Sequence, residues 1–138
     1  MLLVSKKSIK RVRKTIKAIT RKTRGLAFET IIKELNQKLP GWVRYFKLAK
    51  AKTLLRSIDE WIRRRLRCYR IKQAKRTYTK VKMLVAMGVK SYQAWIFALS
   101  GKGTWRLSKT PQMNTAMNIQ WFEKLGLQSL EKVYLSMQ

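Results

Sequence analysis

Arginine dominates one short stretch of the chain, residues 59–76, which reads DEWIRRRLRCYRIKQAKR. Four arginines fall within residues 63–67, and no acidic residue follows Glu60 before Glu123. A guanidinium group donates a planar fork of hydrogen bonds that fits a phosphate, and it also stacks on exposed bases. Crowded like charges repel one another, so an external anion is needed to neutralise them. The stretch therefore predicts binding of a polyanion.

Residues that would support catalysis are scarce. The chain contains no histidine, which excludes histidine-based acid–base catalysis and histidine-ligated metal sites. Asp59 is the only aspartate, whereas two-metal polymerase and nuclease sites need clustered carboxylates. The single cysteine, Cys68, is interpreted as a small helix residue, and residues 101–103 lack the rest of a phosphate-binding loop. The sequence predicts a protein that is not an enzyme and that binds no cofactor itself.

Composition supports a folded, strongly basic protein. The 138 residues are 46% hydrophobic and include 33 Lys+Arg against 6 Asp+Glu, a formal net charge of +27. That apolar content is too high for a disordered polycation and is enough for a modest core. The charge lies mainly in two blocks, residues 5–24 and 61–82, each with ten basic residues and no acidic one. Two separate basic strips indicate a groove for nucleic acid, with an anionic membrane surface as a weaker alternative.

The first basic block has helical periodicity. Apolar residues recur at spacings of three and four, and basic residues gather on the opposite face. The apolar stripe consists of Ile9, Val12, Ile16 and Ile19, and the basic face of Lys10, Lys14, Lys17 and Arg21. We expect an amphipathic helix that begins with Ser5 or Ser8 as a cap and stops after Arg24 at Gly25.

Two further helical stretches follow before the arginine cluster. The first carries apolar residues from Phe28 to Leu39 and is expected to end at Pro40-Gly41. The second is a short aromatic helix. Its apolar positions are Trp42, Tyr45, Phe46 and Leu48. Aromatic residues at that spacing favour a place in the core over a base-stacking platform.

The arginine cluster itself lies on a predicted helix. Its buried stripe is formed by Leu55, Ile58, Ile62, Leu66 and Tyr69. At 100° per residue, Arg63, Arg67 and Arg70 lie opposite that stripe. Arg64 falls further round the helix, and Arg65 borders the apolar stripe. We therefore predict a folded helix with a cationic outer face that contacts nucleic acid.

The remainder of the chain predicts shorter helices. One ends at Gly88, one follows Ser91 as a possible cap, and one occupies the segment SLEKVYLSM near the C-terminus. Residues 100–111 are expected to form a turn-rich basic loop. Its Trp105 either stacks on RNA bases or folds the loop onto the body. The predicted fold is a compact all-α domain, with a helical domain over residues 5–90 and a helical extension over 91–138.

Several segments together resemble a known family. They are SKKSIKRVRKTIKAITRKTRG, IIKELNQKLPGWVRYFKLAKAK, IDEWIRRRLRCYRIKQAKR and GKGTWRLSKTP with the later WFEKLGLQSL, which span about residues 4–136. In order and spacing they resemble the C-terminal thumb, or maturase (X) domain, of group II intron-encoded reverse transcriptases. The resemblance implies a thumb-like helical bundle that binds folded intron RNA and helps the ribozyme reach its splicing-competent structure.

The same resemblance sets limits on activity. No segment resembles the polymerase fingers and palm with their catalytic aspartates, or the endonuclease module that contains His and Cys. Group II splicing is carried out by the RNA, so Mg²⁺ is expected only through the RNA. Two alternatives stay open: a thumb subunit that completes a split reverse transcriptase, and a structural RNA-binding protein of ribosomal type. With no signal peptide or membrane-spanning run, a bacterial cytoplasmic location is expected, and an organellar origin is left open.

The predicted RNA-binding residues come from both basic blocks and from the segments around them. They are Lys10, Lys14, Lys17, Arg21, Arg44, Lys50, Arg63, Arg64, Arg65, Arg67, Arg70, Lys72, Lys75, Arg76, Lys80, Lys82, Lys102, Trp105 and Arg106. The expected partner is structured RNA, a group II intron in particular, with a separately encoded reverse transcriptase as a second one. No membrane or small-molecule partner is expected.

Overall fold

Helices form the architecture throughout the part of the chain that the computed structural model describes, residues 6–47 and 49–137. Their order is α1 (Lys6–Ile19), α2 (Phe28–Phe46), α3 (Lys52–Gln73), α4 (Thr77–Ala86), α5 (Ser91–Ala98), α6 (Thr104–Leu107), α7 (Pro111–Ala116), α8 (Ile119–Lys124) and α9 (Leu130–Ser136). These residues contain no strand, so the all-α prediction is confirmed. None of these helices is long and apolar enough to cross a membrane.

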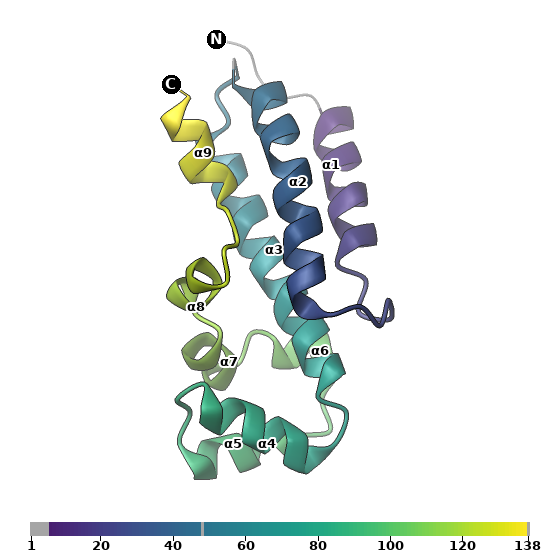
Figure 1. Ribbon diagram of the computed structural model, residues 1–138, viewed down its shortest axis with the longest axis vertical. Helices are drawn as coiled ribbons and strands as arrows, with labels where there is room; N and C mark the ends of the chain where they lie inside the picture. Colours follow the sequence, from purple (N-terminus) through teal and green to yellow (C-terminus); the bar gives the residue numbers. More distant parts are fainter. Residues whose placement is uncertain (1–5, 48, 138) are drawn as a thin grey trace.

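Three long helices, α1, α2 and α3, lie side by side along the long axis of the molecule (Figure 1). Helix α9 packs on α2 and α3 at the end of the molecule where α1 begins. The α4–α5 hairpin forms the opposite end, and α6, α7 and α8 line the middle. Helix α3 is central because α1, α6 and α9 all contact it.

The apolar stripes predicted from spacing form the core. All five stripe residues of α3, from Leu55 to Tyr69, are buried, as are Val12 and Ile16 of α1. Ile9 is half-buried, and Ile19 packs against the core from its edge. One apolar cluster reaches from Val12 to Tyr134. It crosses residue 90, and the division into 5–90 and 91–138 stays a prediction.

Helix α1 ends five residues earlier than predicted. The Thr20 hydroxyl donates to the Ile16 carbonyl at 2.8 Å, and Arg24 folds back to donate to the Ile19 carbonyl at 2.9 Å. These side chains satisfy the last carbonyls of the helix and stop it at Ile19. Gly25 has φ +71°, but in the loop after the helix and not at its end. Of the two proposed caps, Ser5 lies outside the described residues and Ser8 lies inside the helix.

Helix α2 continues through Pro40 and Gly41, where an end was predicted. Proline lacks the amide hydrogen that would bond the carbonyl of residue 36, which costs stability in a helix interior. Leu39, Val43 and Phe46 are fully buried on the same side, and their burial offsets that loss. The aromatic helix expected after Gly41 is thus the last part of α2, and its Leu48 lies outside the described residues.

The C-terminal half differs from the sequence prediction in two places. Residues 104–107, expected as loop, form the short helix α6, whose Leu107 is buried. Ser91 is the first residue of α5 and makes no capping bond, because Lys90 holds the N-cap position. The stop at Gly88 is confirmed: Gly88 has φ +96°, and the Val89 amide donates to the Leu84 carbonyl.

Candidate nucleic-acid interface

An open groove of about 660 Å³ lies between the end of α1, the loop after it, α3 and α6. Lys14, Lys17, Arg21 and Lys22 line one side, Arg65 lines the floor, and Trp105 lines the other side. These residues are up to 91 positions apart in the sequence. The fold thus places basic residues of the first block and one member of the arginine cluster, Arg65, around one cavity.

Arg65 fixes the floor of this groove. Its Nε donates to the Thr20 hydroxyl at 3.0 Å, and a terminal nitrogen donates to the Lys17 carbonyl at 3.0 Å. Both acceptors lie at the C-terminal end of α1, where the helix dipole favours a cation. Burial lowers the pKa of Arg65 from its usual value, and nearby Arg21 acts in the same direction. Arg65 is thus half-buried and joins α3 to α1, and its place at the border of the apolar stripe stays a prediction.

Arg64 shapes the opposite side of the groove. Its guanidinium lies 3.7 Å from the centroid of the Trp105 ring, and it also donates to the Trp105 carbonyl at 2.8 Å and to the Ser108 hydroxyl at 3.1 Å. Cation–π stacking of this kind holds Trp105 against α3 while leaving it 44% exposed. The ring is thus folded onto the body and still partly open to solvent. Whether it also stacks on RNA stays a prediction.

Lys22 closes one end of the groove and was not singled out from the sequence. Its Nζ donates to the Thr104 hydroxyl at 2.9 Å, which links the loop after α1 to the start of α6. Buried Cys68 lies on the floor below and donates weakly to the Thr104 carbonyl at 3.4 Å. A basic residue in a loop gives no periodic signal, so only the tertiary structure identifies Lys22.

The electrostatics of the groove are one-sided. Its lining contains no carboxylate, while Lys14, Lys17, Arg21 and Lys22 are all exposed. Cations with no acid between them raise the local concentration of anions and attract phosphate. The groove is therefore suited to the sugar–phosphate backbone of a nucleic acid.

A second cleft, of about 280 Å³, lies on another side of α3 and has mixed charge. It lies between α3, α8 and α9, and Arg63 lines it. Its carboxylates, four of the six in the chain, are Asp59, Glu60, Glu123 and Glu131. Arg56 forms a bidentate pair with Glu131 at 3.0 Å, and Lys132 pairs with Glu123 at 2.9 Å. Arg63 thus lies among carboxylates and not in the cationic groove.

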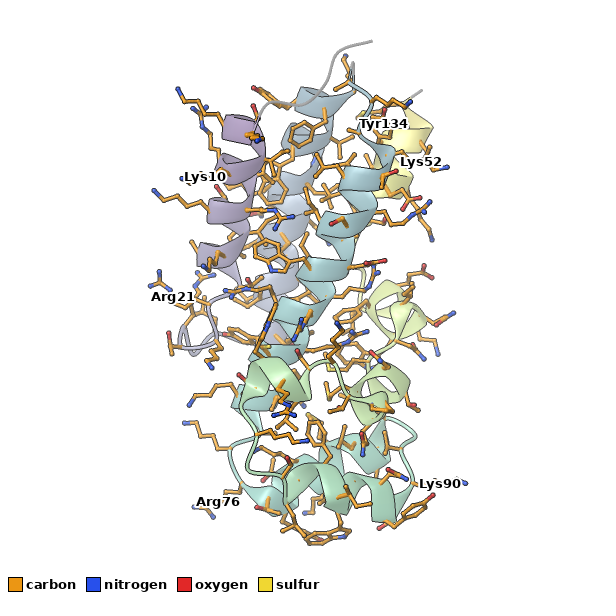
Figure 2. All side chains as sticks on the ribbon, turned by 180° about the vertical axis from the view of Figure 1, so that it is seen from behind. Lys10, Arg21, Lys52, Arg76, Lys90 and Tyr134 are labelled. Carbon is orange, nitrogen blue, oxygen red and sulfur yellow. The ribbon has the colours of Figure 1, made fainter. Side chains whose placement is uncertain are left out.

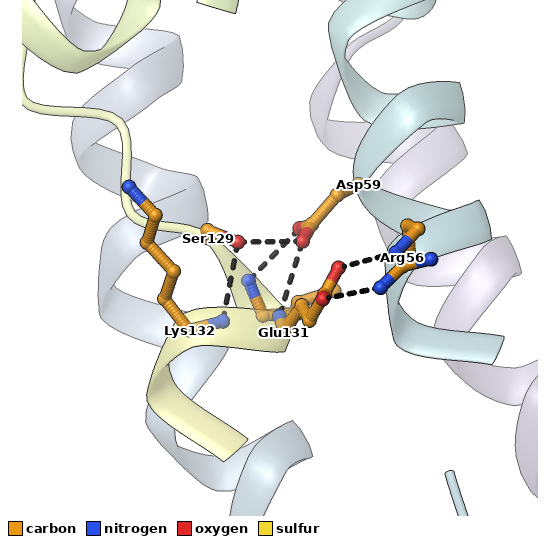
Figure 3. A network of polar contacts seen from close by, with 6 residues as sticks. Arg56, Asp59, Ser129, Glu131 and Lys132 are labelled. Atoms are coloured by element: carbon orange, nitrogen blue, oxygen red, sulfur yellow. Dashed lines mark hydrogen bonds and ion pairs between the residues drawn. The ribbon is translucent and has the colours of Figure 1, made fainter. Parts of the chain in front are cut away.

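Asp59 caps helix α9 within this cleft (Figure 3). Its carboxylate accepts from the Ser129 hydroxyl at 2.7 Å and from the amides of Leu130 and Glu131 at 2.9 and 3.1 Å. The carboxylate thereby satisfies amides that the first turn of a helix leaves unpaired. Burial raises the pKa of Asp59, against the opposing effect of these bonds and of nearby Arg63. The only aspartate of the chain thus has a structural role.

Arg67 contradicts the prediction of an exposed arginine face. It is half-buried, and two of its nitrogens donate to the Met117 carbonyl at 2.8 and 3.0 Å, with the guanidinium 5.8 Å from the centroid of the Phe122 ring. Burial lowers its pKa. The periodicity indicated one buried stripe, but α3 is packed on several sides. The arginine stem is therefore covered by the segment that joins α7 to α8.

The other predicted residues are spread over the surface. Most are exposed and lie outside the lining of the groove, and Arg70 and Lys80 are half-buried. The exposed ones are Lys10, Arg44, Lys50, Lys72, Lys75, Arg76, Lys82, Lys102 and Arg106. The structure brings together Lys14, Lys17, Arg21, Arg65 and Trp105 in the groove and leaves these exposed residues as a wider basic surface.

No metal centre stands out in the part of the chain that the structure describes, where no three His, Cys, Asp or Glu side chains gather suitably to hold an ion. The role of Asn36, in the segment IIKELNQKLPGWVRYFKLAKAK that supported the resemblance, is also structural. Its amide nitrogen donates to the Gly126 carbonyl at 2.7 Å, and its oxygen accepts from the Gln128 amide at 3.0 Å. Asn36 and Asp59 thus both hold the segment that leads into α9.

Comparison with protein families assigns the first four helices. Residues 9–86, more than half of the chain, match the family described as group II intron, maturase-specific domain. The chain therefore belongs to the group II intron maturase-specific domain family, which confirms the resemblance seen in the sequence. A comparison with curated proteins finds no match. The match includes the groove walls on α1 and α3 and ends before α5 and α6.

Proposed function

We propose that this protein is a non-catalytic RNA-binding maturase that stabilises the folded, splicing-competent structure of a group II intron. The observation that carries the proposal is the cationic groove, in which Lys14, Lys17 and Arg21 face Arg65 and Trp105 with no carboxylate among the lining residues. Family membership supports an intron as the RNA. The chemistry of splicing then belongs to the RNA and to its Mg²⁺ ions.

The mechanism is selective stabilisation of one RNA shape. Helices of RNA that crowd together repel through their phosphates, and a cationic groove placed at such a junction neutralises that charge. A protein that binds the compact RNA more tightly than the extended one shifts the folding equilibrium by this difference in affinity. Each neutralised phosphate also releases counter-ions, so affinity falls steeply as salt rises.

The test compares two variants with the same change in net charge. The groove variant is Lys14→Gln, Lys17→Gln and Arg21→Gln, and the control is Lys33→Gln, Lys38→Gln and Lys124→Gln, which replaces exposed lysines outside the groove. Affinity for a group II intron RNA is measured over a range of salt concentrations. We expect a slope consistent with at least about six phosphates for the wild type, and a loss of roughly 0.7–0.9 per removed contact only in the groove variant.

Equal affinities of the two variants would contradict the role of the groove. Splicing of the intron at low Mg²⁺, with and without protein, tests the maturase role itself. Competition by ribosomal RNA separates this proposal from a structural RNA-binding protein of ribosomal type, because a maturase prefers the intron. The groove also suits a thumb subunit of a split reverse transcriptase, for which we expect binding of a template–primer duplex.

A further inference from the structure

The α4–α5 hairpin carries an unusual outer surface. On helix α5, the apolar side chains of Trp95, Ile96 and Leu99 are 40%, 59% and 70% exposed. The buried side of the helix is Ala94, Phe97 and Ala98. Residues at spacings of three and four share one helix face, so Tyr92, 60% exposed, joins the open side.

Helix α4 extends this surface with another aromatic ring. Tyr78 is 59% exposed, and its ring centroid lies 6.4 Å from that of Trp95, with the two planes at 38°. Lys82, one turn further along α4, places its Nζ 4.7 Å from the Tyr78 centroid. The aromatic surface, defined as Tyr78, Tyr92 and Trp95, therefore combines three accessible rings with an adjacent cation.

The electrostatic surroundings indicate which occupant fits. Figure 2 shows Arg76 and Lys90 at opposite edges of the hairpin end, and both side chains are exposed. No acidic residue occurs between Glu60 and Glu123. A second copy of this chain, with a net charge of +27, would be repelled. A polyanion is favoured, and the rings favour one that carries flat bases.

We propose that the aromatic surface is a stacking platform for unpaired bases of an RNA strand. The rings stack on bases, and Lys82, Arg76 and Lys90 contact the flanking phosphates. This inference rests on the proposed function in one respect: it takes the polyanion to be RNA. The aromatic surface lies at the end of the molecule remote from α9 and shares none of the residues that line the groove.

The experiment measures dependence on bases and not affinity alone. Fluorescence anisotropy compares a labelled, unpaired oligoribonucleotide of alternating C and A, about ten nucleotides long, with an abasic strand of equal length. Stacking contributes roughly 1–3 kcal/mol per base, so the wild type is expected to prefer the strand with bases by about tenfold or more. The variant Tyr78→Ala, Tyr92→Ala, Trp95→Ala should lose this preference and keep its affinity for the abasic strand within about twofold.

Two matched variants identify the chemistry. Tyr78→Phe, Tyr92→Phe, Trp95→Phe keeps the rings and should keep most of the preference. The variant Ile96→Ala, Leu99→Ala removes apolar area from the same face of α5. It should change the preference for the strand with bases by less than about threefold. Circular dichroism confirms that each variant is folded, and the undiminished affinity for the abasic strand provides a second check.

The platform would be contradicted if the wild type bound both strands equally. It would also be contradicted if the preference for bases were lost in the variant with three phenylalanines, or lost in the Ile96→Ala, Leu99→Ala variant as fully as in the variant with three alanines. Finally, it would be contradicted if polyglutamate or phosphatidylglycerol vesicles competed as well as the strand with bases. The last would indicate an acidic protein or a lipid surface. The groove variant should weaken both strands equally. Failure of the proposed function appears separately, as an intron affinity that is insensitive to the groove variant while the preference for bases persists.

Discussion

The cationic groove and the mixed-charge cleft lie on different sides of the same helix, α3, and use arginine differently. At the groove, Arg65 is bonded to the end of α1 beside exposed lysines, Arg64 holds Trp105 against α3, and the lining contains no carboxylate. In the cleft, Arg56 and Arg63 lie among four carboxylates, and contacts of Asp59, Glu123 and Glu131 hold α9 in place. Thus a basic cluster in the sequence contributes to folding on one side and to a candidate binding site on the other.

Arg67 provides the largest expected effect on the folding side of this comparison. Arg67→Met keeps an apolar stem beside Phe122 and removes both hydrogen bonds to the Met117 carbonyl. We expect a loss of about 2 kcal/mol in the free energy of unfolding, because a charge-assisted pair disappears and an acceptor is left unsatisfied. Urea unfolding measures it. Arg70→Met, on the same helix, should stay within about 0.5 kcal/mol of wild type, and equal losses in both would contradict the anchoring role.

A substitution of Asp59 tests whether the mixed-charge cleft stabilises the fold and takes no part in RNA binding. Asp59→Asn weakens a cap that accepts three hydrogen bonds at the start of α9, with an expected cost of about 1–2 kcal/mol. Thermal unfolding measures the change, and the exposed neighbour Glu60→Gln is the control. RNA affinity of the folded Asp59 variant should stay unchanged. A drop in that affinity would mean that the cleft takes part in binding.

Single neutralisations compare the two sides directly. Arg21→Gln removes a cation from the groove and Arg63→Gln removes one from the cleft, with the same change in net charge. Only Arg21→Gln should lower the salt slope, by roughly 0.7–0.9, which is about threefold in affinity over a fourfold rise in salt. Filter binding at several salt concentrations measures the salt slope of RNA affinity for both variants. A larger effect of Arg63→Gln would reverse the assignment of the two sides.

The smallest expected effect is on the dependence of stability on acidic pH. Hydrogen bonds from Arg24 lower the pKa of Glu34, and those from Arg56 lower that of Glu131. A glutamate whose pKa is lowered in the folded state stabilises the fold at pH values above its unfolded-state pKa, about 4.3. This contribution is lost as the pH falls through the folded-state pKa. Asp59, with its raised pKa, acts in the opposite sense. Glu34→Gln should flatten the acid dependence of urea unfolding, and exposed Glu29→Gln should not.

Most of the fold could be predicted from the sequence because apolar spacing reports burial directly. The stripes of α1, α2 and α3 are found where the pattern placed them. The end of α1 could not be predicted, because Arg24 terminates it through a contact made only after folding. Pro40 was misleading for a related reason: its local penalty is offset by tertiary burial of Leu39 and Val43.

The candidate site was predicted in part. The two basic blocks predicted a shared groove, and the structure has one lined by Lys14, Lys17 and Arg21 of the first block but only by Arg65 of the second. The spacing of arginines could not show that Arg67 faces the segment between α7 and α8, since short helices without strong periodicity give no sign of where they pack. The exposure of Trp95 on α5 also gave no signal in the sequence, because spacing alone does not say which apolar residues of a short helix face solvent.

The hydrogen bonds of Arg65 determine how the groove would select its ligand. With two of its donors already held by Thr20 and Lys17, Arg65 is rigid before any RNA arrives, and its remaining donors have a fixed direction. The exposed lysines along the rim keep their rotamer freedom until they bind, so their contribution is reduced by the entropy they lose. Arg65 on the floor would therefore set the register of the RNA, and the exposed lysines would determine how tightly it binds.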